Sequence, residues 1–359
     1  MTTVIKWLAA ILITFANPIV GRTDTACKGV DLLLDTSSAR TILNIIAGHG
    51  GSQAIASALK LPGNVALVRK THEFGRNVSV GDLGRALSVL QAGETLAKDS
   101  FGLNRLKEKS EDAEALLALF ERDHDKLLKG VCEYMSPYLP DDYREQMTIR
   151  VLAGGYATGF TFEGETDFYI AAHNIGDDPA GLQLILIHEL FHIVQAARSP
   201  LQVAELEAIR DKNLTRGNAL AHLFNGYLEG GATYVADPAE FEGEGPTVMF
   251  FKDSLNKNMK VIRRHFITFE AYLYQLFNDP DADADAIYAA GFYDDGPMYF
   301  VGYYMAKKLE EKYGGEKIRA MLDQHPSRFY LDYIAICRAN DDLLCFSKRA
   351  ESIIRETMG

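Results

Sequence analysis

Several features that mark other protein classes are scarce or missing in this chain of 359 residues. Its four cysteines include no C-x-x-C pair, which removes support for a thiolate zinc site or a thioredoxin-type motif. Positive charge is not in excess. The formal net charge is −12, which argues against a nucleic-acid-binding protein because such proteins usually present a basic face. The sequence also has no internal repeat of fixed period and no low-complexity tract, so nothing indicates a repeat architecture.

Outside the N-terminus we expect no segment long and apolar enough to span a membrane. At the N-terminus, one lysine precedes an apolar run from Trp7 to about Ala16, and small residues follow. This run falls short of the ~20 apolar residues that a membrane span needs. Its layout is typical of a secretory signal peptide, with Thr14 and Ala16 as a small-x-small cleavage site. The alternative is a buried first helix. We expect residues 1–26 to hold the signal peptide, and the mature protein to be secreted or periplasmic with no stable membrane span.

If the chain is exported, its four cysteines can form two disulfides, because their number is even. The stretch CRANDDLLC, from Cys337 to Cys345, could close a short loop, and we predict a disulfide between these two residues. The alternative is four unpaired, buried thiols.

Apolar residues make up 47% of the sequence, enough for a substantial core. Helical patterns extend from residue 29 to about 140, and short β-branched and aromatic runs between 147 and 174 predict strands. From about 247 the chain is again helical. These patterns predict an α+β, mostly helical protein. The expected divisions are a signal peptide (1–26), an N-terminal helical region (27–140), a core (141–240) and a C-terminal helical subdomain (241–359).

The stretch LILIHELFHIVQAAR, residues 184–198, is an apolar helical run that contains three ionisable groups. His188 and His192 stand four residues apart, so their rings project from one face and can both reach a tetrahedral Zn²⁺. Glu189 lies about 100° round the helix, where it can engage a metal-bound water without being a ligand. This is the H-E-x-x-H pattern of metallopeptidases. The alternative, a core helix with satisfied histidines, is costly because a buried carboxylate without a partner destabilises the fold.

A catalytic zinc needs a third protein ligand. The extended motif with a third histidine is absent, because Gln195 and Arg198 occupy the relevant positions. Glu229, 37 residues after His192 in NGYLEGGATYVAD, is the best candidate, and the Gly-Gly-Ala that follows it would let two helices approach closely. Rival ligands are His222, Asp237 and Glu205.

The segments HELFHIVQ, YLEGGATYV and GPMYFVGYYMAKKLEEKYGGEKIRAML together resemble the gluzincin superfamily of zinc-dependent peptidases. They are similar to often exported bacterial families predicted to be zinc peptidases, in which E-G-x-A-x-Y follows H-E-x-x-H. The resemblance covers roughly residues 147 to 322. It implies a zincin-like core, consisting of a small twisted sheet, an active-site helix and a glutamate helix, with one Zn²⁺ per chain.

The resemblance implies further roles in the site. The strand nearest the metal, here TDFYIAAHN, would pair with an extended peptide substrate. Thermolysin-like gluzincins place an Asp four residues after the ligand Glu, whereas this chain has Thr233, so Asp237 would have to compensate.

A Tyr or His beyond the glutamate helix often stabilises the oxyanion in gluzincins, and we select Tyr299 for this role. Tyr303 would share its helical face, and Tyr304 would point away. The alternative is that all three tyrosines pack in the core.

These observations predict an exported zinc metallopeptidase that hydrolyses peptide bonds in peptides or proteins. His188, His192 and Glu229 would hold the zinc, and Glu189 would act as general base toward a zinc-activated water. One alternative is a non-catalytic binding protein on a zincin scaffold, which the intact Glu189 disfavours. Another is a helical interaction protein in which the motif is accidental.

Overall fold

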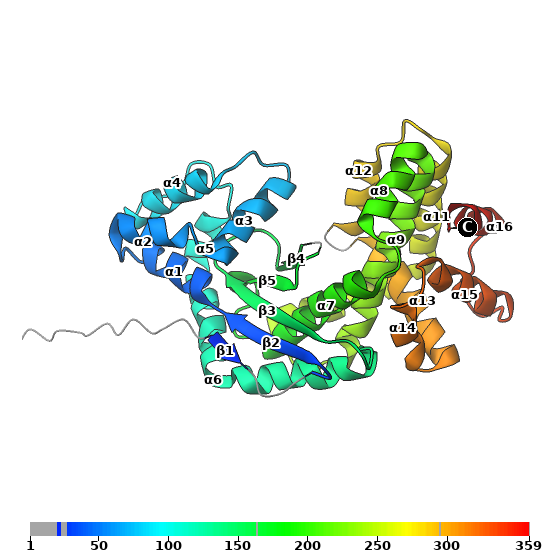
Figure 1. The fold of residues 1–359 in the computed structure, drawn as a ribbon, viewed down its shortest axis with the longest axis horizontal. Coiled ribbons are helices and arrows are strands. Elements are labelled where there is room, and N and C mark those ends of the chain that lie inside the picture. Colours follow the sequence, from blue (N-terminus) through cyan, green and yellow to red (C-terminus); the bar gives the residue numbers. More distant parts are fainter. Residues whose placement is uncertain (1–19, 23–26, 163, 294–295, 359) are drawn as a thin grey trace, which may run out of the picture.

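The computed structural model describes residues 20–22, 27–162, 164–293 and 296–358 (Figure 1). The predicted signal peptide, including Thr14 and Ala16, therefore lies outside the described residues except for the short strand β1 (Val20–Arg22). Helices dominate, and a single small sheet of mixed direction accompanies them in the described part of the chain. The α+β, mostly helical prediction is confirmed.

The sheet has the strand order β1-β2-β3-β5-β4. Its other strands are β2 (Val30–Asp35), β3 (Glu145–Leu152), β4 (Gly159–Thr161) and β5 (Asp167–Ala171). The central strands β2, β3 and β5 are parallel, while β1 and β4 lie antiparallel at the two edges. The strands predicted between residues 147 and 174 are confirmed.

The prediction that the chain is helical from residue 29 was wrong at β2. In VDLLLD the buried and the partly exposed side chains alternate with a period of two, as in a strand. The run is too short to distinguish strand from helix by itself. Its pairing decides the matter, because Asp35 aligns with Arg150 of β3, and the Arg150 side chain donates to the Asp35 carboxylate at 2.6 Å.

Six helices lie between β2 and β3 in the chain. They are α1 (Ser37–Ile46), α2 (Gly51–Ala58), α3 (Pro62–Glu73), α4 (Val80–Gln91), α5 (Leu103–Glu108) and α6 (Ser110–Met135), with a 3-10 turn η1 (Ser136–Tyr138). Helices α1 and α3 pack on β3. The long α6 packs on the motif helix α7 (Pro179–Arg198), which in turn contacts the edge strand β4.

The C-terminal half is helical, as predicted. A 3-10 turn, η2 (Ala172–Asn174), precedes α7. The elements after α7 are α8 (Val203–Lys212), α9 (Leu214–Val235), η3 (Pro238–Glu240), α10 (Pro246–Met259), α11 (Ile262–Asn278), α12 (Ala284–Phe292), α13 (Pro297–Tyr313), α14 (Glu316–Met321), α15 (Ser327–Arg338) and α16 (Lys348–Met358). Figure 1 shows α7 between the sheet on one side and these helices on the other. Helix α9 packs against α7, α11 and α13.

Two adjacent glycines of α9 face different neighbours. A Cβ on Gly230 would lie 2.2 Å from the Cα of Gly302, so here α9 and α13 meet backbone to backbone. A Cβ on Gly231 would instead lie 3.0 Å from Nε2 of Gln195 on α7. The predicted close approach of α9 to the motif helix thus depends on Gly231, whereas Gly230 serves a contact that the sequence did not indicate.

Two disulfides are present, Cys27–Cys132 and Cys337–Cys345. The predicted pairing of Cys337 with Cys345 is confirmed. The other disulfide joins the segment just before β2 to α6, across 105 residues.

By length and composition, α7 is the one helix in the described ranges that could cross a membrane, with a mean hydropathy of 1.3. The sequence pattern had not suggested a span there. In the fold, 61% of its apolar window is buried inside the protein, as in the core helix of a folded domain.

Candidate metal centre

Helix α7 is fixed at its start and apolar along its length. Asp178 caps it by accepting a hydrogen bond from the Gly181 backbone N–H at 2.9 Å, and Pro179 occupies the first helical position. The ionisable side chains of the motif interrupt the apolar surface at one place. The side chains of His188 and His192 remain 19% and 15% exposed, so the site is open to small molecules rather than sealed in the core.

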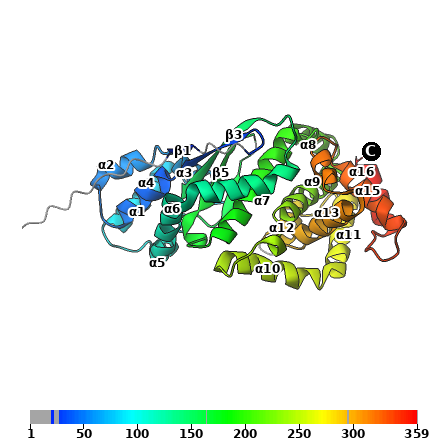
Figure 2. The ribbon, with the colours of Figure 1, turned by 90° about the horizontal axis from the view of Figure 1, so that it is seen from below.

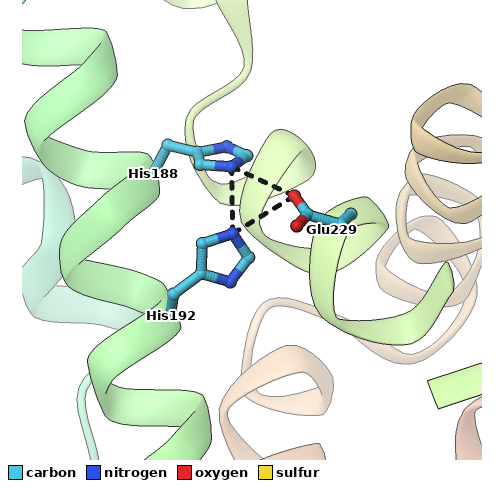
Figure 3. A group of neighbouring side chains, drawn as sticks. All are labelled: His188, His192 and Glu229. Carbon is cyan, nitrogen blue, oxygen red and sulfur yellow. Dashed lines mark hydrogen bonds and ion pairs between the residues drawn. The ribbon is translucent and has the colours of Figure 1, made fainter. Parts of the chain in front are cut away.

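Figure 3 shows both imidazoles of α7 and the carboxylate of Glu229 on α9 pointing toward one another. The Nε2 atoms of His188 and His192 are 3.0 Å apart. The Oε2 atom of Glu229 lies 3.2 Å from Nε2 of His192 and 3.4 Å from Nε2 of His188. The structure thus brings together the three residues that the sequence predicted as ligands.

These separations fit a zinc ion. Ligand bonds of ~2.0–2.2 Å in tetrahedral geometry place neighbouring donor atoms roughly 3.3 Å apart. The three observed separations lie on either side of that value, and the donors are those that zinc prefers. Within the described residues, this is the one group of at least three His, Cys, Asp or Glu side chains close enough to hold a metal ion.

The charges of the group also favour a cation. Burial by itself would lower the pKa of His192, but the neighbouring Glu229 carboxylate raises that pKa to about 9. Burial acts against ionisation of Glu229 too, yet the two histidines hold the pKa of its carboxyl far below the usual range. The carboxylate is therefore anionic and draws positive charge to the point where the three donors meet. A divalent metal can supply that charge in place of a proton.

Gln195 contacts a residue of the candidate metal group, and the sequence did not single it out for this place. Its Oε1 lies 2.9 Å from Nδ1 of His192, and its Nε2 donates to the Leu228 carbonyl at 3.1 Å. The side chain is buried, and it spans from α7 to α9. Because a carbonyl oxygen only accepts, Nδ1 must carry the proton, which leaves Nε2 free to bind a metal. Its position three residues after His192 on the same helix was the available signal.

The Glu189 carboxylate lies at the sheet edge, and the charges of His188, His192 and Glu229 act on it. A Cβ on Gly159 of β4 would lie 3.0 Å from Oε1 of Glu189. Burial raises the pKa of this carboxyl. Glu189 is thus beside the metal group without belonging to it, which is the placement that the motif predicts for a base.

Of the three candidate tyrosines, Tyr299 lies at the site. Its ring centroid is 6.5 Å from that of His188, and burial together with the neighbouring Glu229 carboxylate raises the pKa of its hydroxyl well above the usual value. Tyr303 was expected to share this face, but its hydroxyl donates to Asp237 at 2.6 Å. Tyr304 packs against Phe266 and Tyr333, away from the site as expected.

The rival ligands lie elsewhere. His222 is buried against the ring of Phe269, with the two centroids 4.7 Å apart, and Glu205 is exposed on α8. Asp237 is buried and accepts from Tyr303, with Lys307 3.5 Å away. The expectation that Asp237 compensates for Thr233 was therefore wrong, because its carboxylate is committed to α13. The side chain that contacts His192 at the position expected for a second carboxylate is Gln195.

The expected substrate strand was also assigned wrongly. The segment TDFYIAAHN contains β5, which pairs with β3 on one side and β4 on the other and so has no free edge. The strand beside Glu189 is β4, which pairs only with β5 in the described sheet. A free edge next to the base is available on β4 alone.

A family model described as "Putative zinc dependent peptidase (DUF5700)" matches residues 55–342. The chain belongs to this family. Membership agrees with a zinc-dependent hydrolase that acts on peptides or proteins, and the matched region contains all three donor residues. Comparison with curated proteins and with solved structures found no significant match.

Proposed function

We propose that the protein is an exported zinc metallopeptidase of the gluzincin type, with one Zn²⁺ per chain. The observation that carries the proposal is the convergence of His188, His192 and Glu229 within 3.4 Å of one another, with Glu189 beside them and outside the ligand group. The alternative of a non-catalytic binding protein gives no reason for a carboxylate at that position. Export is proposed from the N-terminal sequence.

Each residue has a distinct part in this proposal. The three donors hold the metal, and Gln195 keeps Nε2 of His192 directed at it. Bound there, Zn²⁺ would supply Lewis acidity, which makes a water acidic near neutral pH and polarises a carbonyl. Glu189 takes a proton from the attacking water and returns it to the leaving amine. Tyr299 donates a hydrogen bond to the oxygen that gains charge.

The zincin-like core is part of the same proposal. The sheet edge at β4, the motif helix α7 and the glutamate helix α9 correspond to its expected elements, within the proposed core of residues 141–240. An extended peptide would add to the free edge of β4, because backbone groups there have no partner strand in the described sheet. The scissile bond would then lie next to Glu189. β2 joins this sheet from the N-terminal region.

Metal analysis and turnover test the function together. Purified mature protein should contain about one zinc per chain, chelation should abolish cleavage of a peptide library, and added zinc should restore it. His188→Ala should lose the metal. Protein that contains no metal and cleaves peptides equally well after His188→Ala would contradict the proposal.

Replacement of the base separates catalysis from metal binding. We expect Glu189→Gln to keep the zinc and to lose at least ~10²-fold in kcat, because the proton acceptor is removed while the ligands stay. Glu205→Gln is the matched control, since Glu205 is exposed on α8 and should behave like the wild type. Peptide-cleavage assays measure kcat, and elemental analysis measures the zinc content. Full activity of Glu189→Gln would place the base elsewhere.

A further inference from the structure

A cavity of about 340 Å³ lies where the start of β4, α5, α6 and α10 meet. Figure 2 shows α5 and α10 on the same side of the molecule. Its lining combines cationic, amide, hydroxyl and aromatic groups, contributed among others by Arg105, Lys109, Tyr156, Thr158, Asn174 and Phe250. The volume lies at the lower end of the range for pockets that hold small ligands or single side chains.

The cavity is adjacent to the proposed catalytic base. Thr158 lines it, and a Cβ on the next residue, Gly159, would lie 3.0 Å from Oε1 of Glu189. Consecutive Cα atoms are ~3.8 Å apart, so the cavity begins about one residue from the strand position beside the base. Tyr156, two residues before Thr158 on the same segment, also lines it. A peptide lying along β4 would therefore pass the mouth of this cavity.

One positive charge in the lining has no counterpart. Lys109 is 3.5 Å from Asp112, and Asp177 is 3.9 Å from Arg122. The guanidinium of Arg105 makes no hydrogen bond or ion pair with any residue in the described part of the chain. The field of the two cations reaches the neighbouring His173, whose pKa falls to about 4 through burial and then through Arg105 and Lys109. Among the charged groups of the lining, the guanidinium of Arg105 is therefore the one left for a ligand to pair with.

Two other residues of the lining contribute to binding. The Tyr156 ring is held in place, and the Asn174 amide has hydrogen-bonding groups that no described residue uses. Tyr156 is fixed by its hydroxyl, which donates to the Asp99 carbonyl at 2.8 Å, and by Arg76, 4.2 Å from the ring centroid. The two polar side-chain atoms of Asn174 are buried and have no hydrogen-bond partner within the described residues. An acceptor bound in the cavity would supply the hydrogen bond that this amide lacks.

We propose that this cavity is a substrate subsite that binds a carboxylate, and that Arg105 is the residue that selects it. The inference rests on the proposed peptidase function and adds a substrate class to it: peptides with a carboxylate close to the scissile bond. That carboxylate is either a Glu or Asp side chain or the free C-terminus of the peptide. Arg105 forms a charge-assisted ion pair with the substrate carboxylate, and the rings of Tyr156 and Phe250 flank the aliphatic part of the same substrate residue.

The test compares matched peptides and matched arginine variants. One peptide series carries Glu or Gln at each position, and a second ends in a free carboxylate or an amide. The wild type should prefer the carboxylate form at one position by about 10- to 100-fold in kcat/KM. Arg105→Gln should abolish that preference and leave the neutral peptides within about twofold. Arg85→Gln, an exposed arginine of α4 that pairs with Asp82, should resemble the wild type.

Charge reversal gives a sharper result. Arg105→Glu should turn the preference toward Lys at the same position. The Glu/Gln series and the carboxylate/amide series show which source of carboxylate is bound. Cleavage without discrimination, or a preference that survives in Arg105→Gln, would overturn the inference while leaving the peptidase function intact.

Binding of the same peptides to Glu189→Gln, measured by calorimetry, separates the two proposals. The subsite is supported if Glu189→Gln binds the carboxylate form more tightly than the neutral form and the additional substitution Arg105→Gln removes this difference. This result counts even where no form of the enzyme cleaves a peptide. Peptides that are neither bound nor cleaved would overturn both proposals.

Discussion

Gln195 is a neutral side chain that joins two helices of the proposed metal site. Its amide links His192 to the backbone of α9, so the orientation of one ligand is tied to the helix that supplies another ligand, Glu229. Outer contacts of this kind fix the tautomer of a ligating histidine. In the proposed zinc site the neutral amide of Gln195 has this part, where many zinc sites use a carboxylate.

Replacement of Gln195 should therefore weaken zinc binding without removing a ligand. We expect Gln195→Ala to lower zinc affinity by about 10- to 100-fold, because the His192 ring loses its fixed orientation. Gln195→Glu should retain most of the affinity, since a carboxylate also accepts from Nδ1. Competition with a chromophoric chelator measures both. Equal affinities for Gln195→Ala and the wild type would show that the amide has no such role.

The two neighbouring tyrosines of α13 should give opposite results. Tyr299→Phe should lower kcat by roughly 10- to 10³-fold with unchanged zinc content, because a donor to the developing charge is lost. Tyr303→Phe should leave kcat of the folded enzyme nearly unchanged and lower the melting temperature, because the buried Asp237 loses a hydrogen bond. Kinetics and thermal melts on both variants decide the matter. The reverse pattern would exchange their roles.

At the scale of elements, the position of the third ligand depends on how α9 packs. Gly230 meets Gly302 of α13 at backbone distance, and Gly231, one residue on, faces α7. Helix α9 is thus held between two partners, and Glu229 immediately precedes these contacts. A shift of α9 away from α13 would carry the Glu229 carboxylate with it.

Gly230→Ala should be strongly destabilising. The added Cβ would lie 2.2 Å from the Cα of Gly302, and neither backbone can move without separating α9 from α13. We expect a loss of about 2–4 kcal/mol in the free energy of unfolding, together with weaker zinc binding. Gly81→Ala in α4, where a Cβ meets atoms no closer than 3.6 Å, is the control and should be neutral or stabilising by up to ~1 kcal/mol. Denaturant unfolding compares them, and similar effects at both positions would contradict this account of the packing.

At the scale of the whole molecule, the two disulfides differ in what they constrain. Cys27–Cys132 closes a loop across 105 residues and joins the start of β2 to α6, whereas Cys337–Cys345 spans 8 residues at the end of α15. In the chain-entropy model, the stabilisation grows with the length of the closed loop.

Removal of the longer-range disulfide should therefore cost more. We expect the Cys27→Ser, Cys132→Ser double variant to lose roughly 4–5 kcal/mol and the Cys337→Ser, Cys345→Ser variant roughly 2–3 kcal/mol. Denaturant unfolding under non-reducing conditions measures the difference. A larger loss for the short loop would mean that local packing, and not chain entropy, dominates.

Features that depend only on neighbouring residues could be predicted from the sequence alone. His188 and His192 share a face because a helix places residues four apart one above the other, and no tertiary contact is needed to fix this. The strands between residues 147 and 174 and the disulfide Cys337–Cys345 were also predictable, because they too depend on residues that are close together in the sequence. Glu229 could be proposed from its residue type and its setting, but His222 and Asp237 were not excluded by the sequence.

The features that depend on contacts between residues far apart in the sequence became clear only from the tertiary structure. Packing turns Glu229 toward α7, His222 toward the ring of Phe269, and Asp237 toward Tyr303. The edge position of β4 depends on β5 pairing with β3, and β2 enters the sheet by pairing with residues more than a hundred positions away. Local periodicity carries no information on which of two adjacent strands keeps a free edge, because that depends on the order of the whole sheet.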